Sequence, residues 1–244
     1  MMISPHALET VARRLSVVGL NRCQAIATAT LPPEVWLPES RRPLSDEAEE
    51  TTLILVGHSG TALWDHMTDG DQQTALDPTT DPIDTFSVDT TNAVIGEQWA
   101  DVARQLLYPH PDCPVDLVAL GRVIGWQADS PLGLGIHPEH GPWSAFRALW
   151  ILTAALDPGA ATPPVPAPDV CLACETHDCV HACPADAVHV GRRFNLTACF
   201  DHRAEPDSSC AVTCFARLAC PVGAQHRYSS EQMAYHYGIS RPSR

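Results

Sequence analysis

The sequence predicts an α+β protein in which a region of mixed strands and helices precedes a small cysteine-rich region. Helical and strand patterns alternate in the first region. Residues 1–170 contain only Cys23 and Cys113, whereas residues 171–220 contain the other eight cysteines. Between these regions, the proline-rich stretch DPGAATPPVPAPD at 157–169 is typical of an extended connector. We therefore expect two domains, 1–168 and 169–244, and a helix at the end of the second.

The first elements follow from local patterns. Residues 4–20, SPHALETVARRLSVVGL, begin with serine and proline, which favour a helix start, and Leu8, Val11 and Leu15 recur at helical spacing. Residues 51–60, TTLILVGHSG, form a short apolar run that ends in glycine and predicts a buried strand. The segment TALWDHM at 61–67 is expected to begin the next helix.

The later elements are less uniform in pattern. Residues 92–107, NAVIGEQWADVARQLL, predict a longer amphipathic helix. VDLVAL at 115–120 is a further apolar run. FRALWILTAAL at 146–156 is compatible with either a strand or a helix by its period alone.

Composition narrows the classes of function. The formal net charge is −14, and all 15 basic residues are arginines. Such an acidic chain is a poor partner for nucleic-acid phosphates or anionic lipid, so we expect neither nucleic acid nor a membrane as partner. The N-terminus lacks the apolar run of a signal peptide, and we expect a cytoplasmic protein with reduced thiols. Ten cysteines in such a compartment indicate metal ligation or redox chemistry.

The cysteine spacing predicts two four-iron clusters. It reads Cys171-x2-Cys174-x4-Cys179-x3-Cys183-Pro, then Cys199, then Cys210-x3-Cys214-x5-Cys220-Pro. In bacterial ferredoxins each run ends in Cys-Pro, and that last cysteine ligates the other cluster. We therefore assign Cys171, Cys174, Cys179 and Cys220 to one 4Fe-4S cluster, and Cys183, Cys199, Cys210 and Cys214 to the other.

Two alternatives stay open for these thiols. Eight thiolates also suffice for two structural zinc sites, although zinc does not account for the two Cys-Pro endings. Disulfides are the third reading. Several gaps between the cysteines are longer than in a standard ferredoxin. This departure affects which cluster each cysteine would ligate more than it affects the count of two clusters. Cys23 and Cys113 are expected to be small core residues.

The order of these cysteines resembles that of epoxyqueuosine reductase. In that family an α/β cobalamin-binding domain precedes a two-cluster ferredoxin module, and reductive dehalogenases share the architecture. The resemblance implies that residues 169–244 form a bacterial-ferredoxin-like domain with two 4Fe-4S clusters.

A second resemblance lies in the first region and near the C-terminus. GIHPEHGPWSAFRALWIL at 135–152, DPID at 81–84, LILVGHSGTALWD at 53–65 and RYSSEQMAY at 227–235 are similar to segments of CblC-type cobalamin-processing proteins, in the same order. This implies a nitroreductase-like α/β sheet domain that binds base-off cobalamin. The vertebrate members lack the cysteine tail, so here the electrons are expected to come from the chain's own clusters.

The resemblance also implies site residues. Arg147 and Arg227 align with arginines that hold the substrate end of the pocket, and His137 and Trp143 are expected to line the cofactor. Asp129, just before this loop, is a candidate proton donor. Each has a structural alternative: Arg147 as a paired arginine, Trp143 as a core residue, and RYSSEQ as the capping box of a helix.

Together these features predict an iron–sulfur oxidoreductase. It would bind a corrinoid (cobalamin), or another small-molecule substrate, and reduce it or remove its upper axial ligand. An external donor such as a ferredoxin or flavodoxin would supply the electrons, and flavin is the alternative occupant of the pocket. The rival functions are epoxyqueuosine reduction, for which a basic face is expected, and a ferredoxin-type electron carrier with a docking domain.

Overall fold

The computed structural model describes residues 1–37, 50–69, 76, 81–162 and 165–240, and the chain divides into two compact units. The first unit comprises Met1–Ile124 and Ala145–Val165, and the second comprises Gly125–Ser144 and Pro166–Arg244. Residues 125–144 thus pack with the cysteine-rich region. Residues 163–164 of the predicted connector lie outside the described residues, and a domain boundary at 168/169 stays a prediction.

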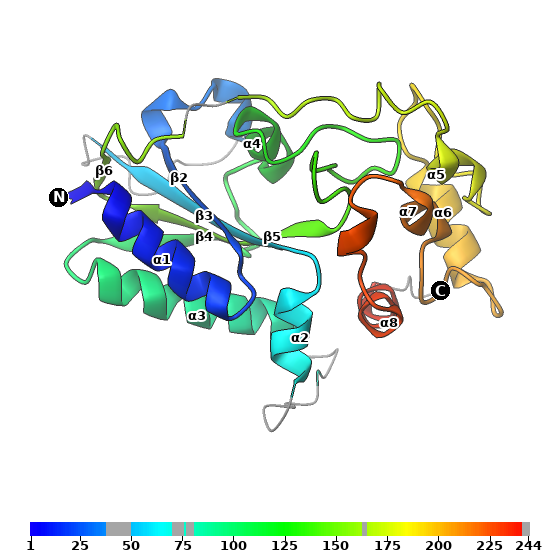
Figure 1. Cartoon of the computed structure of the whole chain (residues 1–244), viewed down its shortest axis with the longest axis horizontal. Coiled ribbons are helices and arrows are strands. Elements are labelled where there is room, and N and C mark those ends of the chain that lie inside the picture. Colours follow the sequence, from blue (N-terminus) through cyan, green and yellow to red (C-terminus); the bar gives the residue numbers. More distant parts are fainter. Residues whose placement is uncertain (38–49, 70–75, 77–80, 163–164, 241–244) are drawn as a thin grey trace. The chain divides into compact units, whose positions relative to one another are not determined.

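A four-stranded sheet forms the centre of the first unit (Figure 1). Its strand order is β2 (Arg22–Ala27), β3 (Thr52–Ser59), β5 (Ser144–Leu152) and β4 (Arg104–Tyr108). β2 pairs antiparallel with β3, and β4 pairs antiparallel with β5. Every residue of β3 is buried, as expected for a central apolar strand. The short strands β1 (Met2–Ile3) and β6 (Ala155–Leu156) form a separate parallel pair.

Helices pack on this sheet through side chains that the sequence places on one face. In α1 (Pro5–Val17), Ser4 caps the N-terminus by accepting a hydrogen bond from the Ala7 N–H at 3.3 Å, and Val11 and Leu15 are buried. α1 contacts both β2 and α3 (Pro82–Gln98). The indole Nε1 of Trp150 on β5 donates to the Thr91 hydroxyl of α3 at 2.9 Å, which ties that helix to the sheet.

Shorter helices complete the first unit. These are α2 (Ala62–Thr68), α4 (Leu117–Val123) and the 3-10 turns η1 (Thr28–Thr30) and η2 (Pro33–Val35). Asp116 caps α4 by accepting hydrogen bonds from the backbone N–H groups of Val118 and Ala119.

The structure confirms the helix predicted in 4–20, the strand in 51–60 and the helix that starts after it. The single helix predicted at 92–107 is wrong. α3 ends at Gln98, and residues 104–108 form β4 because they pair with β5. The same pairing makes residues 144–152 a strand, whereas the spacing of the apolar residues alone is compatible with either a strand or a helix. Pairing with a distant strand overrides the local period in both segments.

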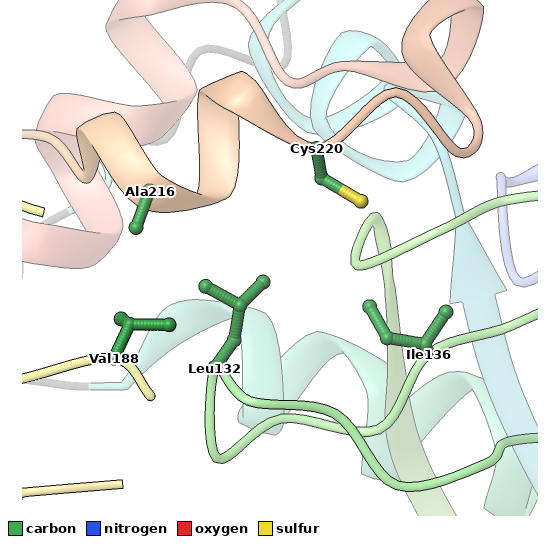
Figure 2. Packing of buried hydrophobic residues seen from close by; sticks show 5 residues of the cluster. All are labelled: Leu132, Ile136, Val188, Ala216 and Cys220. Atoms are coloured by element: carbon green, nitrogen blue, oxygen red, sulfur yellow. The ribbon is translucent and has the colours of Figure 1, made fainter. Parts of the chain in front are cut away.

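The second unit is built from short helices and loops around its cysteines. The helices are α5 (Asp178–His181), α6 (Leu196–Ala204), α7 (Phe215–Ala219), η4 (Ala224–His226) and α8 (Ser230–Ile239). Figure 2 shows the centre of its core, where α7 and neighbouring loops bring together Leu132, Ile136, Val188, Ala216 and Cys220. Four further cysteines pack against this core: Cys171, Cys179, Cys183 and Cys214.

Two glycines join the loop at 137–141 to the loop after Cys220. Gly141 has φ +59° and Gly223 has φ +67°, both in the left-handed region. A Cβ on Gly141 would lie 2.0 Å from the Val222 carbonyl oxygen, and one on Gly223 would lie 2.2 Å from the His140 carbonyl carbon. The two backbones therefore touch, which requires glycine at both positions and places the GIHP segment against the cysteine-rich loops.

Candidate functional site

Four thiols form a first group, which we define as Cys171, Cys174, Cys179 and Cys220. The pKa of Cys171 is raised to about 12, most by burial and then by the nearby Cys220, Asp169, Cys179 and Cys174. Burial likewise raises the pKa of Cys179, followed by the effects of Cys220 and Cys174. Cys171 and Cys179 pack against the core that contains Cys220, which comes from a distant part of the sequence, and Cys174 influences all three electrostatically.

Four other thiols form a second group, which we define as Cys183, Cys199, Cys210 and Cys214. Burial raises the pKa of Cys210, and Cys214, Cys183 and Cys199 add to this effect. All four line one cavity of about 330 Å³. Its wall is otherwise largely apolar and includes Leu132, Val188, Phe194, Phe200 and Phe215. The assignment of the individual cysteines to two clusters stays a prediction.

Two neighbouring residues of α6 bring buried polar atoms to this cavity. Arg203 is 5% exposed, and its guanidinium donates to the Tyr237 carbonyl oxygen at 2.7 Å and to the Ser240 hydroxyl at 3.2 Å. His202 contacts Glu205 through Nδ1 at 3.3 Å. Among the described residues, the buried Arg203 Nε and His202 Nε2 have no hydrogen-bond partner, and the Arg203 Nε–H is a donor next to the cavity.

A second arginine lines the same cavity from α7. The Arg217 guanidinium lies 4.7 Å from the ring centres of both Trp143 and Tyr228, and it donates to the Pro142 carbonyl oxygen at 2.6 and 3.1 Å. Its backbone N–H donates to the Cys214 sulfur at 3.4 Å. Burial raises the pKa of Tyr237, the nearby Cys214 raises it further, and Arg217 lowers it.

Within the described ranges, no set of three or more His, Cys, Asp or Glu side chains is arranged for a single metal ion. An iron–sulfur cube is wider than one ion, and the thiolates around it stand correspondingly farther apart. In the part of the chain that the structure describes, no helix has both the length and the apolar character needed to cross a bilayer.

Three of the segments that resemble CblC-type proteins converge in the first unit. Arg147 on β5 donates through Nε to the Nδ1 atom of His58 on β3 at 3.0 Å. It also pairs through Nη1 with Asp84, in the DPID segment, at 3.3 Å. His58 is 1% exposed, whereas the Arg147 side chain is 13% exposed. The sequence predicted Arg147 as a site residue. His58 and Asp84 belong to the motifs that resemble CblC-type proteins but were not predicted individually.

Tyr108 at the end of β4 belongs to the same polar group. Burial raises the pKa of its hydroxyl, Asp84 raises it further, and Arg147 lowers it. This group therefore combines an oriented guanidinium, a carboxylate, an imidazole and a protonated phenol. Such a set can bind a polar or anionic part of a ligand.

The remaining predicted residues lie in the second unit. His137 accepts hydrogen bonds from the Glu139 and His140 backbone N–H groups through Nδ1, at 3.1 Å each. Its ring packs edge-on against the His140 ring, with ring centres 4.6 Å apart, and the His140 ring in turn lies tilted against that of His226, at 4.3 Å. His140 and His226 are not among the residues predicted from the sequence, because they lie too far apart along the chain for any local pattern to group them.

Trp143, Arg227 and Asp129 lie in different surroundings. Trp143 is fully buried and packs edge-to-face against Tyr228, with ring centres 5.3 Å apart. Arg227 is exposed, donates to the Cys220 carbonyl oxygen at 3.4 Å and lowers the pKa of that thiol, which burial raises most strongly. Asp129 is exposed. The structure thus brings Arg227 next to the first thiol group, and the cofactor and catalytic roles of all three stay predictions.

The fold and site define a class: an α+β chain with a sheet unit and a compact cysteine-rich unit. The solved structures of this fold include an epoxyqueuosine reductase with an epoxyqueuosine-modified tRNA-Tyr stem loop, 14% identical, with TM-score 0.57 over 96% of this chain and 70% of that one. The Bacillus subtilis epoxyqueuosine reductase, with its catalytic aspartate loop swung out of the active site, is 14% identical with TM-score 0.56, over 93% and 68%.

A third neighbour is the B12-trafficking protein CblC from C. elegans. It is 15% identical and superposes with TM-score 0.51 over 96% of this chain and 92% of that one. No protein-family model and no curated protein matches the sequence. The resemblance to both families is therefore confirmed at the level of the fold.

The expectation that nucleic acid is an unfavourable partner is not borne out. One structural neighbour was solved with a tRNA stem loop. Net charge describes the whole molecule, whereas a nucleic acid is bound by one local surface, so the −14 charge is a weak argument against such a partner.

Proposed function

We propose that this chain is an iron–sulfur oxidoreductase in which each thiol group holds one four-iron cluster and the first unit binds a corrinoid that the clusters reduce. The observation that carries the proposal is the cavity that Cys183, Cys199, Cys210 and Cys214 line together. The mutual electrostatic influence of Cys171, Cys174, Cys179 and Cys220 supports a second ligand set, and interleaved Cys-Pro runs are typical of such a division. The likeness of the fold to epoxyqueuosine reductase supports it.

The residues around the second thiol group fit a cluster. Four thiols line one cavity, and an iron–sulfur cube ligated by thiolates carries net negative charge. Arg203 and Arg217 line the same cavity and supply two positive charges, and the unpartnered Arg203 Nε offers a donor. The cluster supplies one-electron transfer, while the protein supplies the ligands, the charge and a largely apolar wall.

The corrinoid part of the proposal rests on the first unit. Arg147, His58 and Asp84 lie in three segments similar to CblC-type proteins, and the fold is like that of a B12-trafficking protein. When bound, a corrinoid supplies chemistry at the upper axial position of cobalt. Arg147 would hold a polar group of this ligand, since its guanidinium is already oriented by two partners. Flavin is the alternative occupant, and a ferredoxin or flavodoxin would supply the electrons.

Anaerobic purification with iron, sulfide, zinc and cobalt analysis tests the cluster assignment. We expect about eight iron and eight sulfide per chain. Cys174→Ser and Cys210→Ser should each lose about half of the iron, because each removes one ligand from one group. Cys23→Ser, outside both groups, is the control and should retain it. Stoichiometric zinc in place of iron would refute the proposal.

A titration of the reconstituted protein with cob(II)alamin and with flavin mononucleotide, followed by visible spectra, tests the occupant of the first unit. Corrinoid binding supports the proposal, and flavin binding alone supports the alternative cofactor. If neither binds while both clusters are present, the chain is better described as an electron carrier.

Epoxyqueuosine reduction is the second candidate, because a neighbour with TM-score 0.57 was solved with a tRNA stem loop. A gel shift with an epoxyqueuosine-modified anticodon stem loop, with the unmodified stem loop as control, separates it from the first. Selective binding of the modified RNA followed by its reduction would favour this candidate over corrinoid processing.

A further inference from the structure

The two thiol groups differ in the charged and hydroxyl groups around them. The second group has Arg203, which lowers the pKa of Cys199 against the larger effect of burial, and Arg217, which lines the cavity that this group shares. Neither arginine forms an ion pair with a carboxylate within the described part of the chain, and Arg203 is buried. Glu205, the acid next to α6, contacts His202 instead.

Hydroxyl donors add to the positive surroundings of the second group. Tyr237 lines the same cavity as Cys214 and packs with it in one cluster, and Ser209 directly precedes Cys210. Two of the wall's buried nitrogens, Arg203 Nε and His202 Nε2, have no partner among the described residues. Among the described residues, the second group thus has two arginines in its cavity wall, and the one carboxylate that an ion pair brings to this wall, Glu205, contacts His202.

The first thiol group has a balanced environment. Asp169 accepts a hydrogen bond from the Leu172 N–H, next to Cys171, and Arg227 donates to the Cys220 carbonyl oxygen, so one carboxylate and one guanidinium of opposite charge lie beside this group. Both residues are exposed and are therefore better screened by water than Arg203. Backbone N–H groups donate to sulfurs in both groups, for example from Val222 in the first and from Ala187 in the second. The two thiol groups therefore differ in the charged and hydroxyl side chains around them and not in their backbone donors.

We propose that the cluster on the second thiol group has the higher reduction potential of the two, and that Arg203, Arg217 and the Tyr237 hydroxyl create the difference. Reduction by one electron makes a cluster more negative, so adjacent cations and hydrogen-bond donors stabilise the reduced form. This inference rests on the proposed function, since it requires both clusters. A chain that holds one electron keeps it on the second cluster, and the first cluster is the stronger reductant.

An equilibrium redox titration of the anaerobically purified full-length chain tests this inference, with dithionite as reductant and electron paramagnetic resonance as readout. Wild type should show two one-electron waves with separate midpoint potentials. Tyr237→Phe, which removes one hydroxyl, should lower the higher potential and leave the lower one unchanged. Asp169→Asn should raise the lower potential alone. Arg203→Met should act like Tyr237→Phe, while Arg203→Lys, which keeps the charge, should restore most of the wild-type value.

The outcomes separate the two proposals. Iron and sulfide analysis of the same samples decides whether both clusters exist. If both clusters exist, the inference is overturned when the two wild-type waves coincide. It is also overturned when Tyr237→Phe shifts the lower potential or shifts neither. In each of these cases the proposed function stays intact. If iron is absent, both proposals fail. Tyr237→Phe keeps the test decisive even where Arg203→Met loses its cluster.

Discussion

The Arg147 guanidinium is held on two sides before any ligand arrives. His58 accepts its Nε–H, and Asp84 pairs with Nη1. A positioned guanidinium loses less freedom when a ligand binds than a mobile one, so such a residue contributes more to affinity. The carboxylate beside it is 39% exposed, and water can replace the arginine there at moderate cost.

Arg147→Met tests this role. We expect corrinoid affinity to fall at least about tenfold, because an oriented polar contact is lost. The free energy of unfolding should drop by about 1–2 kcal/mol, since His58 and Asp84 lose a hydrogen-bonding partner. Spectral titration and urea denaturation measure the two effects. Iron content should be unchanged, because the thiol groups lie in the other unit.

Arg14→Met is the matched control. Arg14 pairs with Glu97 at 2.6 Å, but both side chains are largely exposed. Such a surface pair contributes little, so this variant should bind corrinoid like wild type and differ by about 0.5 kcal/mol or less in stability. Equal loss of affinity in both variants would show that Arg147 has no specific role.

At the scale of elements, close backbone contact decides how the second unit is assembled. The loop at 137–141 and the loop after Cys220 touch through Gly141 and Gly223, and Cys220 belongs to the first thiol group. The position of that thiol therefore depends on a contact that only glycine allows.

Gly141→Ala should destabilise the second unit by at least about 2 kcal/mol, because the methyl group meets backbone and the φ angle is left-handed. Iron content should fall with it. Gly238→Ala in α8 is the control, since a Cβ there meets no atom within 4 Å. Alanine favours a helix, so this variant should be neutral or slightly stabilising. Full iron retention in Gly141→Ala would contradict the proposed dependence.

The N-terminus of α8 offers a second prediction at this scale. Ser229 accepts a hydrogen bond from the Gln232 backbone N–H at 3.1 Å, whereas Gln232 Oε1 is buried without a partner among the described residues. Only half of the capping box expected from RYSSEQ is thus formed. Ser229→Ala should cost about 1 kcal/mol in thermal or urea unfolding, while Ser229→Thr should restore most of it. Equal stability of Ser229→Ala and Ser229→Thr would show that the cap contributes nothing.

At the scale of the whole molecule, the two units depend on different forces. The first unit has a sheet with a fully buried central strand and apolar helix contacts. The second has short helices around a core in which cysteines take a large share. If the proposed clusters are bound, a core of this kind gains much of its stability from their metal.

Removal of iron should therefore affect the units unequally. After oxidation and chelation, amide hydrogen exchange should show lost protection in α5, α6 and α7, while β3 and β5 keep theirs. Mock-treated protein that retains its iron is the control. Equal protection of the second unit with and without iron would show that its fold does not need the clusters.

The sequence by itself determined the features that depend on local spacing: the eight closely spaced thiols, the helix that starts at Pro5 and the buried strand β3. Only the tertiary structure decided the contacts between distant segments. His58 and Asp84 reach Arg147 across 89 and 63 residues, and residues 104–108 became a strand by pairing with β5. Local propensity is set by neighbouring side chains, whereas pairing and convergence depend on how the whole chain buries its apolar surface.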